Sequence, residues 1–160
     1  VIFLSGGDTY IENEFFKQIH LKDLLKNFEG IIIGQSAGSI NMAESVYNSP
    51  ENGEESEPIY FEGLGLSNIN IEPHFILDTN GFNEMQIYQR NHLLEESKRR
   101  SIYALCDGSH ILETDEYIMV YGKAFLVRDG FITQICDDKC ATNINNEMQT
   151  YGNKFYNKII

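Results

Sequence analysis

Cysteines, basic residues and long apolar runs are all scarce in this chain, and each shortage excludes a class of protein. Its 160 residues include only three cysteines, and so odd and sparse a set is not a disulfide framework. Twelve basic residues stand against 24 acidic ones, for a formal net charge of -12, and such a surface repels nucleic acid and anionic lipid. No stretch approaches the roughly 18 apolar residues of a membrane span, and no signal peptide opens the sequence. We expect a cytoplasmic protein without nucleic-acid or membrane partners.

The remaining composition is that of an ordinary globular domain. Hydrophobic residues make up 42% of the chain, and a chain of this length can form one domain with a real core. We expect a single domain over residues 1–160, with a poorly ordered tail over about residues 140–160. Cys136 and Cys140 have no histidine or third cysteine beside them to complete a zinc site, so no metal site is expected.

The first 45 residues alternate between strand and helix patterns. Two short apolar runs, residues 1–4 and 31–33, are typical of strands that are buried on both faces of a parallel sheet. Between them Ile11, Phe15 and Ile19 repeat with the spacing of one helix face. A second helical pattern follows the second run. This order predicts a strand–helix–strand unit followed by a helix, from which parallel sheets are built.

The second half of the chain has a different pattern. Residues 46–61 are polar and rich in turn formers, and predict a long loop. Residues 67–71 predict a strand and residues 82–99 a helix. Short strands then follow as far as residue 136, joined by tight turns such as the one at Asp129-Gly130.

The strongest local signal is the pentapeptide Gly34-Gln35-Ser36-Ala37-Gly38, which fits the G-x-S-x-G nucleophile elbow. In such an elbow the serine lies on a strained turn between a strand and a helix, and the glycines let neighbouring backbones approach closely. The turn follows a predicted buried strand and precedes a predicted helix, as an elbow requires. We interpret Ser36 as a catalytic nucleophile, the alternative being an inert turn.

A serine nucleophile needs a base, and the chain offers His20, His74, His92 and His110. His20 and His92 fall in helical patterns, where a surface histidine is the simpler explanation. His74 follows Pro73 at a predicted strand end, the edge at which parallel sheets bind ligands. We predict His74 as the general base.

The acid that would orient His74 is less well defined by the sequence. The acidic loop between Ser36 and His74 offers Glu51, Glu54, Glu55 and Glu57, and most glutamates in such a loop face water. The order serine, acid, histidine matches that of other elbow hydrolases. We predict Glu51 as the catalytic acid, with Glu54 as the second candidate.

The turn at Gly6-Gly7 closes the first predicted strand. If the two strands are neighbours, this turn lies beside Ser36, and the Gly7 and Ala37 N–H groups can form an oxyanion hole. The alternative is a simple helix-capping turn.

Taken together, these segments resemble the peptidase E and cyanophycinase family of serine peptidases. Residues 6–9 (GGDT) resemble its G-G-[ND]-T turn, residues 34–38 (GQSAG) its elbow, and residues 72–75 (EPHF) its histidine motif. Residues 103–109 (YALCDGS) are similar to a later Y-A-L-P-D-G-S segment, with Cys106 where proline is common. The matches run in the family's order over roughly residues 1–135.

The resemblance implies a fold and a chemistry. The fold would be a three-layer, flavodoxin-like α/β sandwich with a mostly parallel central sheet and a C-terminal β-hairpin region. The chemistry would be cofactor-free peptide hydrolysis by Ser36, His74 and an acid, with Gly7 and Ala37 at the oxyanion. The substrates would be short peptides, cleaved by a dipeptidase or exopeptidase.

Two departures from the family pattern affect specificity and assembly. Members that cleave after an N-terminal aspartate carry an Arg downstream of the histidine motif; here that position holds Gln86 or Ile87, and Arg90 is the nearest matching substrate-binding residue. The family's N-terminal strand–helix units would also precede residue 1. A sheet without them exposes an edge, which favours association, for instance as a homodimer.

Three other functions compete with this interpretation. A conventional α/β-hydrolase esterase places its histidine much later in the chain than His74. A glutamine amidotransferase needs cysteine at Ser36. A catalytically inactive binding or regulatory protein that retains the fold is the alternative from another class.

Overall fold

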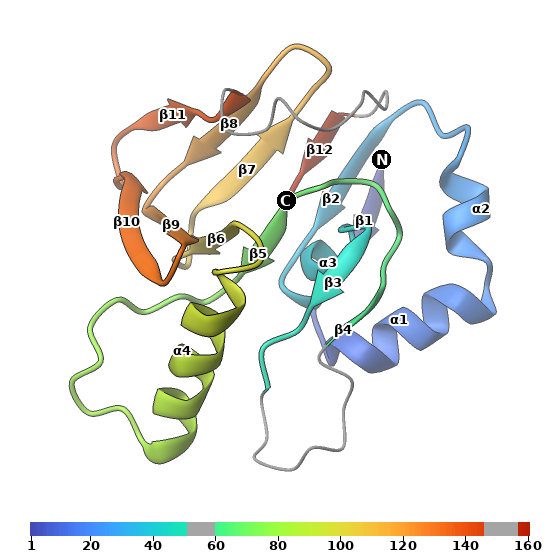
Figure 1. The fold of residues 1–160 in the computed structure, drawn as a ribbon. Coiled ribbons are helices and arrows are strands. Elements are labelled where there is room, and N and C mark those ends of the chain that lie inside the picture. The colour runs from blue at the N-terminus through green and yellow to red at the C-terminus, as the bar shows by residue number, and fades with distance from the viewer. Residues whose placement is uncertain (51–59, 146–156) are drawn as a thin grey trace.

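The computed structural model describes residues 1–50, 60–145 and 157–160, and Figure 1 shows its elements. The helices are α1 (Thr9–Gln18), α2 (Leu21–Leu25), α3 (Ala37–Ile40) and α4 (Glu84–Glu96). The first six strands are β1 (Ile2–Leu4), β2 (Ile31–Gly34), β3 (Ser45–Tyr47), β4 (Tyr60–Glu62), β5 (Asn70–Glu72) and β6 (Ile102–Leu105). The other six are β7 (His110–Glu113), β8 (Ile118–Tyr121), β9 (Ala124–Arg128), β10 (Phe131–Cys136), β11 (Ala141–Asn143) and β12 (Asn157–Ile159).

The predicted strand–helix–strand unit at the start of the chain is present. β1 and β2 pair in parallel with Phe3 opposite Ile33, and α1 and α2 connect them. Because the two strands are parallel, their C-terminal ends lie at the same edge of the sheet (Figure 1). The turn into α3 directly follows the end of β2. The unit therefore brings the glycine turn after β1 beside the serine turn after β2.

The mostly parallel central sheet that the resemblance implied is not what the structure shows, although the α/β class is confirmed. A six-stranded sheet has the order β1-β2-β12-β7-β8-β11, a four-stranded sheet the order β10-β9-β6-β5, and β3 and β4 form a hairpin. Among the named strands of the described residues, the parallel pairs are β1–β2, β2–β12 and β5–β6, and an isolated parallel bridge joins Ala43 to Ser67. The strands after β6 are joined mainly by short connections, and parallel neighbours need a crossover of about a dozen residues.

Two clusters of buried side chains hold these elements together. The larger cluster includes Met42, which follows α3, and residues of both large sheets: Leu4, Ile32, Ile71, Tyr103, Ile111 and Val120. The smaller includes Tyr47, Phe75, Leu93, Ile102, Phe125 and Val127, and packs α4 against the four-stranded sheet. In Figure 1, α1 and α2 lie on one side of the molecule and α4 on the other.

The apolar stripe of α1 does not face the core. Ile11 and Phe15 are 67% and 53% exposed, whereas Asn13 and Phe16 are buried. Asn13 is turned inward because its Nδ2 donates to Asn41 Oδ1 (2.9 Å) and to Glu62 O (3.0 Å). Polar contacts to α3 and β4, and not apolar periodicity, set the rotation of this helix.

Further strands lie at the ends of the predicted loop and in the last 20 residues. β3 and β4 lie at the two ends of the predicted loop over residues 46–61 and pair with each other, with Val46 opposite Phe61. β11 and β12 fall within the last 20 residues, while residues 146–156 lie outside the described part. Within the described part, no helix is long and apolar enough to cross a membrane.

Candidate active site

The turn that carries Ser36 has an unusual backbone conformation. Ser36 has φ 49° and ψ -116°, a positive φ that non-glycine residues rarely adopt and that costs free energy. Hydrogen bonds to the end of β1 hold the turn: Gln35 N donates to Leu4 O (2.9 Å) and Gly38 N to Ser5 O (3.1 Å). The Ser39 hydroxyl donates to Ser36 O (2.6 Å). The strain at Ser36 is therefore imposed by its surroundings, as in a nucleophile elbow.

The glycines around Ser36 are required by close packing. A Cβ on Gly38 would lie 2.3 Å from Leu4 O, and one on Gly34 would lie 2.6 Å from Ser39 Cα. Both are backbone atoms, which cannot move aside as a side chain can. A Cβ on Gly6 would lie 3.3 Å from Ser36 Cβ, so the predicted proximity of the two turns is confirmed.

His74 contacts Ser36 directly. It follows β5 and also has a positive φ, 56°, and the next residue is fixed by a hydrogen bond from Phe75 N to Leu105 O (2.9 Å). Its Nε2 lies 3.0 Å from Ser36 Oγ. With the proton on Nδ1, Nε2 accepts the hydrogen bond of the serine hydroxyl, which is the arrangement that a general base needs.

The other ring nitrogen of His74 faces Asp107. Nδ1 lies 2.6 Å from Asp107 Oδ1. Asp107 lies in the turn after β6, where Cys106 O accepts hydrogen bonds from Ser109 N (3.0 Å) and Ser109 Oγ (2.5 Å). Because β5 and β6 are parallel neighbours, both strand ends project to the same edge. Ser36, His74 and Asp107 thus form a serine–histidine–carboxylate chain.

The carboxylate that contacts His74 comes from Asp107, which lies after His74 in the chain and outside the segment between Ser36 and His74 from which the acid was predicted. Glu51 and Glu54, the residues predicted there, lie outside the described residues. A signal for Asp107 was present, since it directly follows the strand predicted over residues 101–106 and falls in the segment quoted for the family resemblance. Ligands bind at the C-terminal ends of parallel strands, and this rule applies to Asp107 as it does to His74.

The two N–H groups predicted for the oxyanion hole belong to the turns beside Ser36. Ala37 begins α3, so its N–H is one of the free donors of a helix start. Within the described residues, neither Gly7 N nor Ala37 N donates to a backbone carbonyl. Both amides are therefore available to a substrate oxygen.

A pocket of about 110 Å³ lies beside His74, between the loop after β5 and α4. Its walls include Glu72, His74, Phe75, Phe82, Gln86, Gln89 and Arg90. The predicted substrate-binding Arg90 is one of them, with its guanidinium 4.4 Å from the Phe75 ring centroid and 5.7 Å from that of Phe82. It also donates to Ile76 O. Burial lowers the pKa of Arg90, and the charge of Glu72 opposes this effect.

Gln86 cannot replace the arginine that binds an aspartate side chain in the family. Its Oε1 accepts a hydrogen bond from Asn83 N (3.0 Å), and Asn83 Oδ1 accepts one from Gln86 N (2.9 Å). This capping box begins α4. The side chain is folded back onto the helix start and carries no charge.

Glu72 is anchored by the end of the β3 segment. Its Oε2 accepts a hydrogen bond from the Ser49 hydroxyl (2.6 Å). Ser49 Oγ also lies 3.4 Å from Tyr47 OH, and burial raises the pKa of the Tyr47 hydroxyl. The pocket wall at Glu72 is thereby joined to the β3–β4 hairpin.

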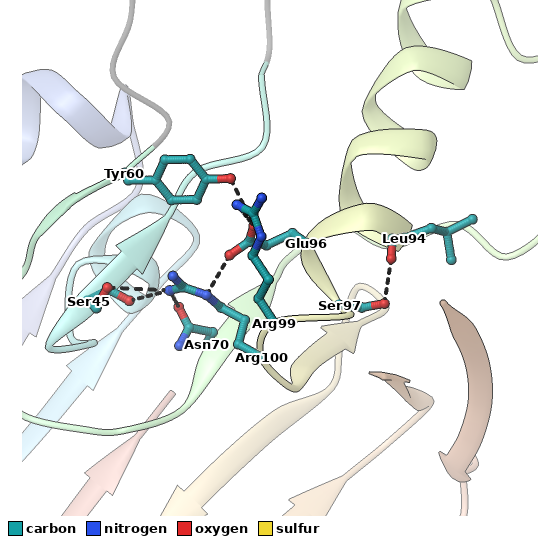
Figure 2. A network of polar contacts seen from close by, with 8 residues as sticks. All are labelled: Ser45, Tyr60, Asn70, Leu94, Glu96, Ser97, Arg99 and Arg100. Atoms are coloured by element: carbon teal, nitrogen blue, oxygen red, sulfur yellow. Dashed lines mark hydrogen bonds and ion pairs between the residues drawn. The ribbon is translucent and has the colours of Figure 1, made fainter. Parts of the chain in front are cut away.

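A buried carboxylate attaches the far end of α4 to the same hairpin (Figure 2). Glu96, 3% exposed, pairs with Arg100 Nε at 2.6 Å and accepts a hydrogen bond from Tyr60 OH at 2.8 Å. Arg100 Nη1 donates in turn to Ser45 O (3.0 Å). This network fixes the helix that forms one wall of the pocket.

No group of three or more His, Cys, Asp or Glu side chains in the described part of the chain could hold a metal ion. The sequence model of Peptidase family S51 matches residues 1–121, a range that includes Ser36, His74, Arg90 and Asp107. A comparison with curated proteins found no match.

Proposed function

The chain belongs to peptidase family S51, and we propose that it is a serine peptidase that cleaves short peptides with Ser36, His74 and Asp107 as its catalytic triad. The observation that carries the proposal is the continuous contact from Ser36 Oγ through the His74 ring to Asp107, at 3.0 Å and 2.6 Å. A second support is the strained backbone at Ser36, which is typical of a nucleophile elbow.

Each residue has a role in the proposed reaction. Ser36 Oγ attacks the peptide carbonyl carbon while His74 Nε2 takes its proton. The carbonyl oxygen becomes an oxyanion, to which the Gly7 and Ala37 N–H groups donate. His74 then gives the proton to the leaving amine, and a water molecule activated by the same ring hydrolyses the acyl-enzyme. Asp107 holds the ring in the required tautomer and stabilises its cation.

The pocket beside His74 favours substrates with a short segment before the cleaved bond. Its volume of about 110 Å³ suits one amino-acid residue, as in a dipeptidase or exopeptidase. Arg90 supplies a guanidinium to the pocket wall and would bind an oxygen of that residue. Specificity for Asp-Xaa dipeptides then depends on Arg90, because Gln86 is bound to the helix start. We also propose a cytoplasmic location, and a homodimer as the assembly.

Fluorophosphonate labelling tests the triad. The probe phosphonylates an activated serine and ignores an inert one, so we expect labelling of the parent chain and none of Ser36→Ala. His74→Ala should reduce the labelling rate by at least about 100-fold, as loss of a general base does. Ser101→Ala, a serine remote from His74, is the control and should label like the parent.

An unlabelled parent chain would refute the peptidase proposal and favour a binding protein that retains the fold. Labelling that persists in Ser36→Ala would place the reactive group elsewhere. Folding of each variant is checked by circular dichroism before labelling.

A further inference from the structure

We propose that Ser109 positions the acid of the catalytic triad, because it closes the turn that holds Asp107 against His74. The inference rests on the proposed function, since it needs Asp107 to act as the acid. The Ser109 hydroxyl donates to the Cys106 carbonyl and not to a reacting group. Ser109 is therefore a positioning residue, which acts through the backbone of the turn that carries Asp107.

The contact between Asp107 and His74 lies at the surface of the protein. The two side chains are 82% and 63% exposed, yet Asp107 Oδ1 lies only 2.6 Å from His74 Nδ1. Packing does not hold a carboxylate that is so exposed, and an exposed ion pair gains little from its own attraction in water. The position of this carboxylate is therefore set by the backbone of its turn.

Ser109 closes that turn with two hydrogen bonds. Ser109 N donates to Cys106 O at 3.0 Å, which is the bond from the fourth to the first residue of a β-turn. Gly108 supplies the positive φ, 88°, at the third position. The Ser109 hydroxyl donates to the same carbonyl oxygen at 2.5 Å. Both donors of Ser109 thus converge on Cys106 O, and Asp107 lies between the two residues that they join.

The neighbouring turn, between β8 and β9, supports the turn of Asp107. Cys106 N donates to Lys123 O at 3.1 Å, which fixes the residue before Asp107. A Cβ on Gly122 would lie 2.9 Å from both Cα and Cβ of Ser109, so the two turns are in close contact at that glycine. The turn that carries Asp107 is thereby held at both of its ends. Such support keeps a catalytic group in its productive geometry.

A double-mutant cycle with a fluorophosphonate probe tests the role of Ser109. Ser109→Ala removes the hydroxyl and should slow the labelling of Ser36 by about 10- to 100-fold, the loss expected when a catalytic group is slightly displaced. In a chain that already carries Asp107→Asn, the same substitution should change the labelling rate by less than about twofold, because no acid remains to be positioned. A purely structural role of Ser109 would slow labelling in both backgrounds.

Two further variants show whether the hydroxyl itself is responsible. Ser109→Thr keeps the hydroxyl donor and should label at a rate within about threefold of the parent chain. Thr114→Val is the matched control. The Thr114 hydroxyl donates to Tyr117 O at 3.1 Å, so it also joins the ends of a four-residue turn, but at the opposite end of β7. Thr114→Val should therefore label like the parent.

Gly122→Ala disturbs the turn of Asp107 from the other side and leaves the Ser109 hydroxyl present. It should slow labelling by at least about 10-fold in the parent chain and should have no further effect in a chain that carries Asp107→Asn. Circular dichroism checks the folding of each variant, and Gly122→Ala provides the test if Ser109→Ala does not fold. Labelling of folded Ser109→Ala at the parent rate, or equal slowing with and without Asp107→Asn, would overturn the inference.

Failure of the inference and failure of the proposed function give different results. An unlabelled parent chain would refute the proposed function, and labelling of Asp107→Asn at the parent rate would refute Asp107 as the acid. Slow labelling of Asp107→Asn, combined with parent-like labelling of Ser109→Ala, would refute only the role of Ser109.

Discussion

Two turns present side chains to His74 from opposite sides, and they differ in how much the sequence reveals about them. The turn at Ser36 has a positive φ at a serine and two glycines that close backbone contacts require. The turn at Asp107 is an ordinary one, with Gly108 at φ 88° and open space around it. The first turn therefore restricts the residue type at Gly34 and Gly38 through close packing, while the second restricts it at Gly108 through a positive φ alone.

A second Asp-Gly turn in the chain makes the contrast clear. Asp129 and Gly130 join β9 to β10 with φ values of 54° and 80°, as a tight hairpin turn requires. The two residues of this pair are the same as those of Asp107-Gly108, so the dipeptide alone does not distinguish the two turns. The parallel pairing of β5 with β6 brings Asp107 to His74 and leaves Asp129 remote from it.

The largest expected effect comes from exchanging the acid. Asp107→Asn leaves the turn intact but cannot stabilise the His74 cation or fix its tautomer, so kcat should fall by about 10³- to 10⁴-fold. Asp129→Asn makes the same change in the other Asp-Gly turn and should leave kcat unchanged. Steady-state hydrolysis of the best dipeptide measures both.

Glu51→Gln completes that experiment, because Glu51 was the acid predicted from the chain order. We expect less than a twofold change in kcat for this variant. A larger loss of kcat in Glu51→Gln than in Asp107→Asn would contradict this assignment and identify Glu51 as the catalytic acid.

The next effect concerns α4, which forms one wall of the pocket. Glu96→Ala leaves Arg100 as an uncompensated charge in a largely buried network, and removal of one partner of such a pair costs about 3–5 kcal/mol. Glu95→Ala removes the neighbouring exposed ion pair with Lys98 and should cost less than about 1 kcal/mol. Urea denaturation gives both free energies of unfolding; equal values would show that the network in Figure 2 contributes no more than a surface pair.

Glycine substitutions compare the two turns directly. Gly38→Ala forces a Cβ to within 2.3 Å of Leu4 O and should destabilise the fold by about 2–3 kcal/mol. Gly108→Ala meets no atom within 4 Å but keeps a φ of 88°, for a cost of about 1–2 kcal/mol. Gly7→Ala, with open space and no strained φ, is the control. The order of thermal midpoints would be reversed if the Ser36 turn were the more tolerant.

The smallest effect concerns the support behind the Ser36 turn. Burial raises the pKa of Glu12, and a hydrogen bond from Asn41 partly offsets the effect. A raised folded-state pKa means that Glu12 favours the fold below its unfolded pKa and loses that contribution as pH rises through its folded pKa. Glu12→Gln should therefore stabilise the protein at pH 7 by about 0.5 kcal/mol or less. The difference from the parent should diminish toward pH 4, as measured by thermal unfolding at both pH values.

How much the sequence could predict varies from element to element. The β1–β2 unit and the Ser36 turn were predictable because apolar runs and glycine-bounded turns are local patterns. The rotation of α1 was not predictable. Its apolar residues indicated one buried face, whereas the hydrogen bonds of Asn13 to residues of α3 and β4 bury another. The β3–β4 hairpin was missed because its two strands are short and a long polar segment separates them.

The sequence by itself determined that Ser36 lies on a strained turn, that Gly6-Gly7 adjoins it, and that His74 closely follows a strand. Each of these follows from interactions within a few residues or from one parallel pair. The tertiary structure alone decided which carboxylate meets His74, and that Glu72 and Arg90 share one pocket beside it. Residues distant in the chain become neighbours through strand register and helix packing, and the free energy that selects among such arrangements is summed over the whole core.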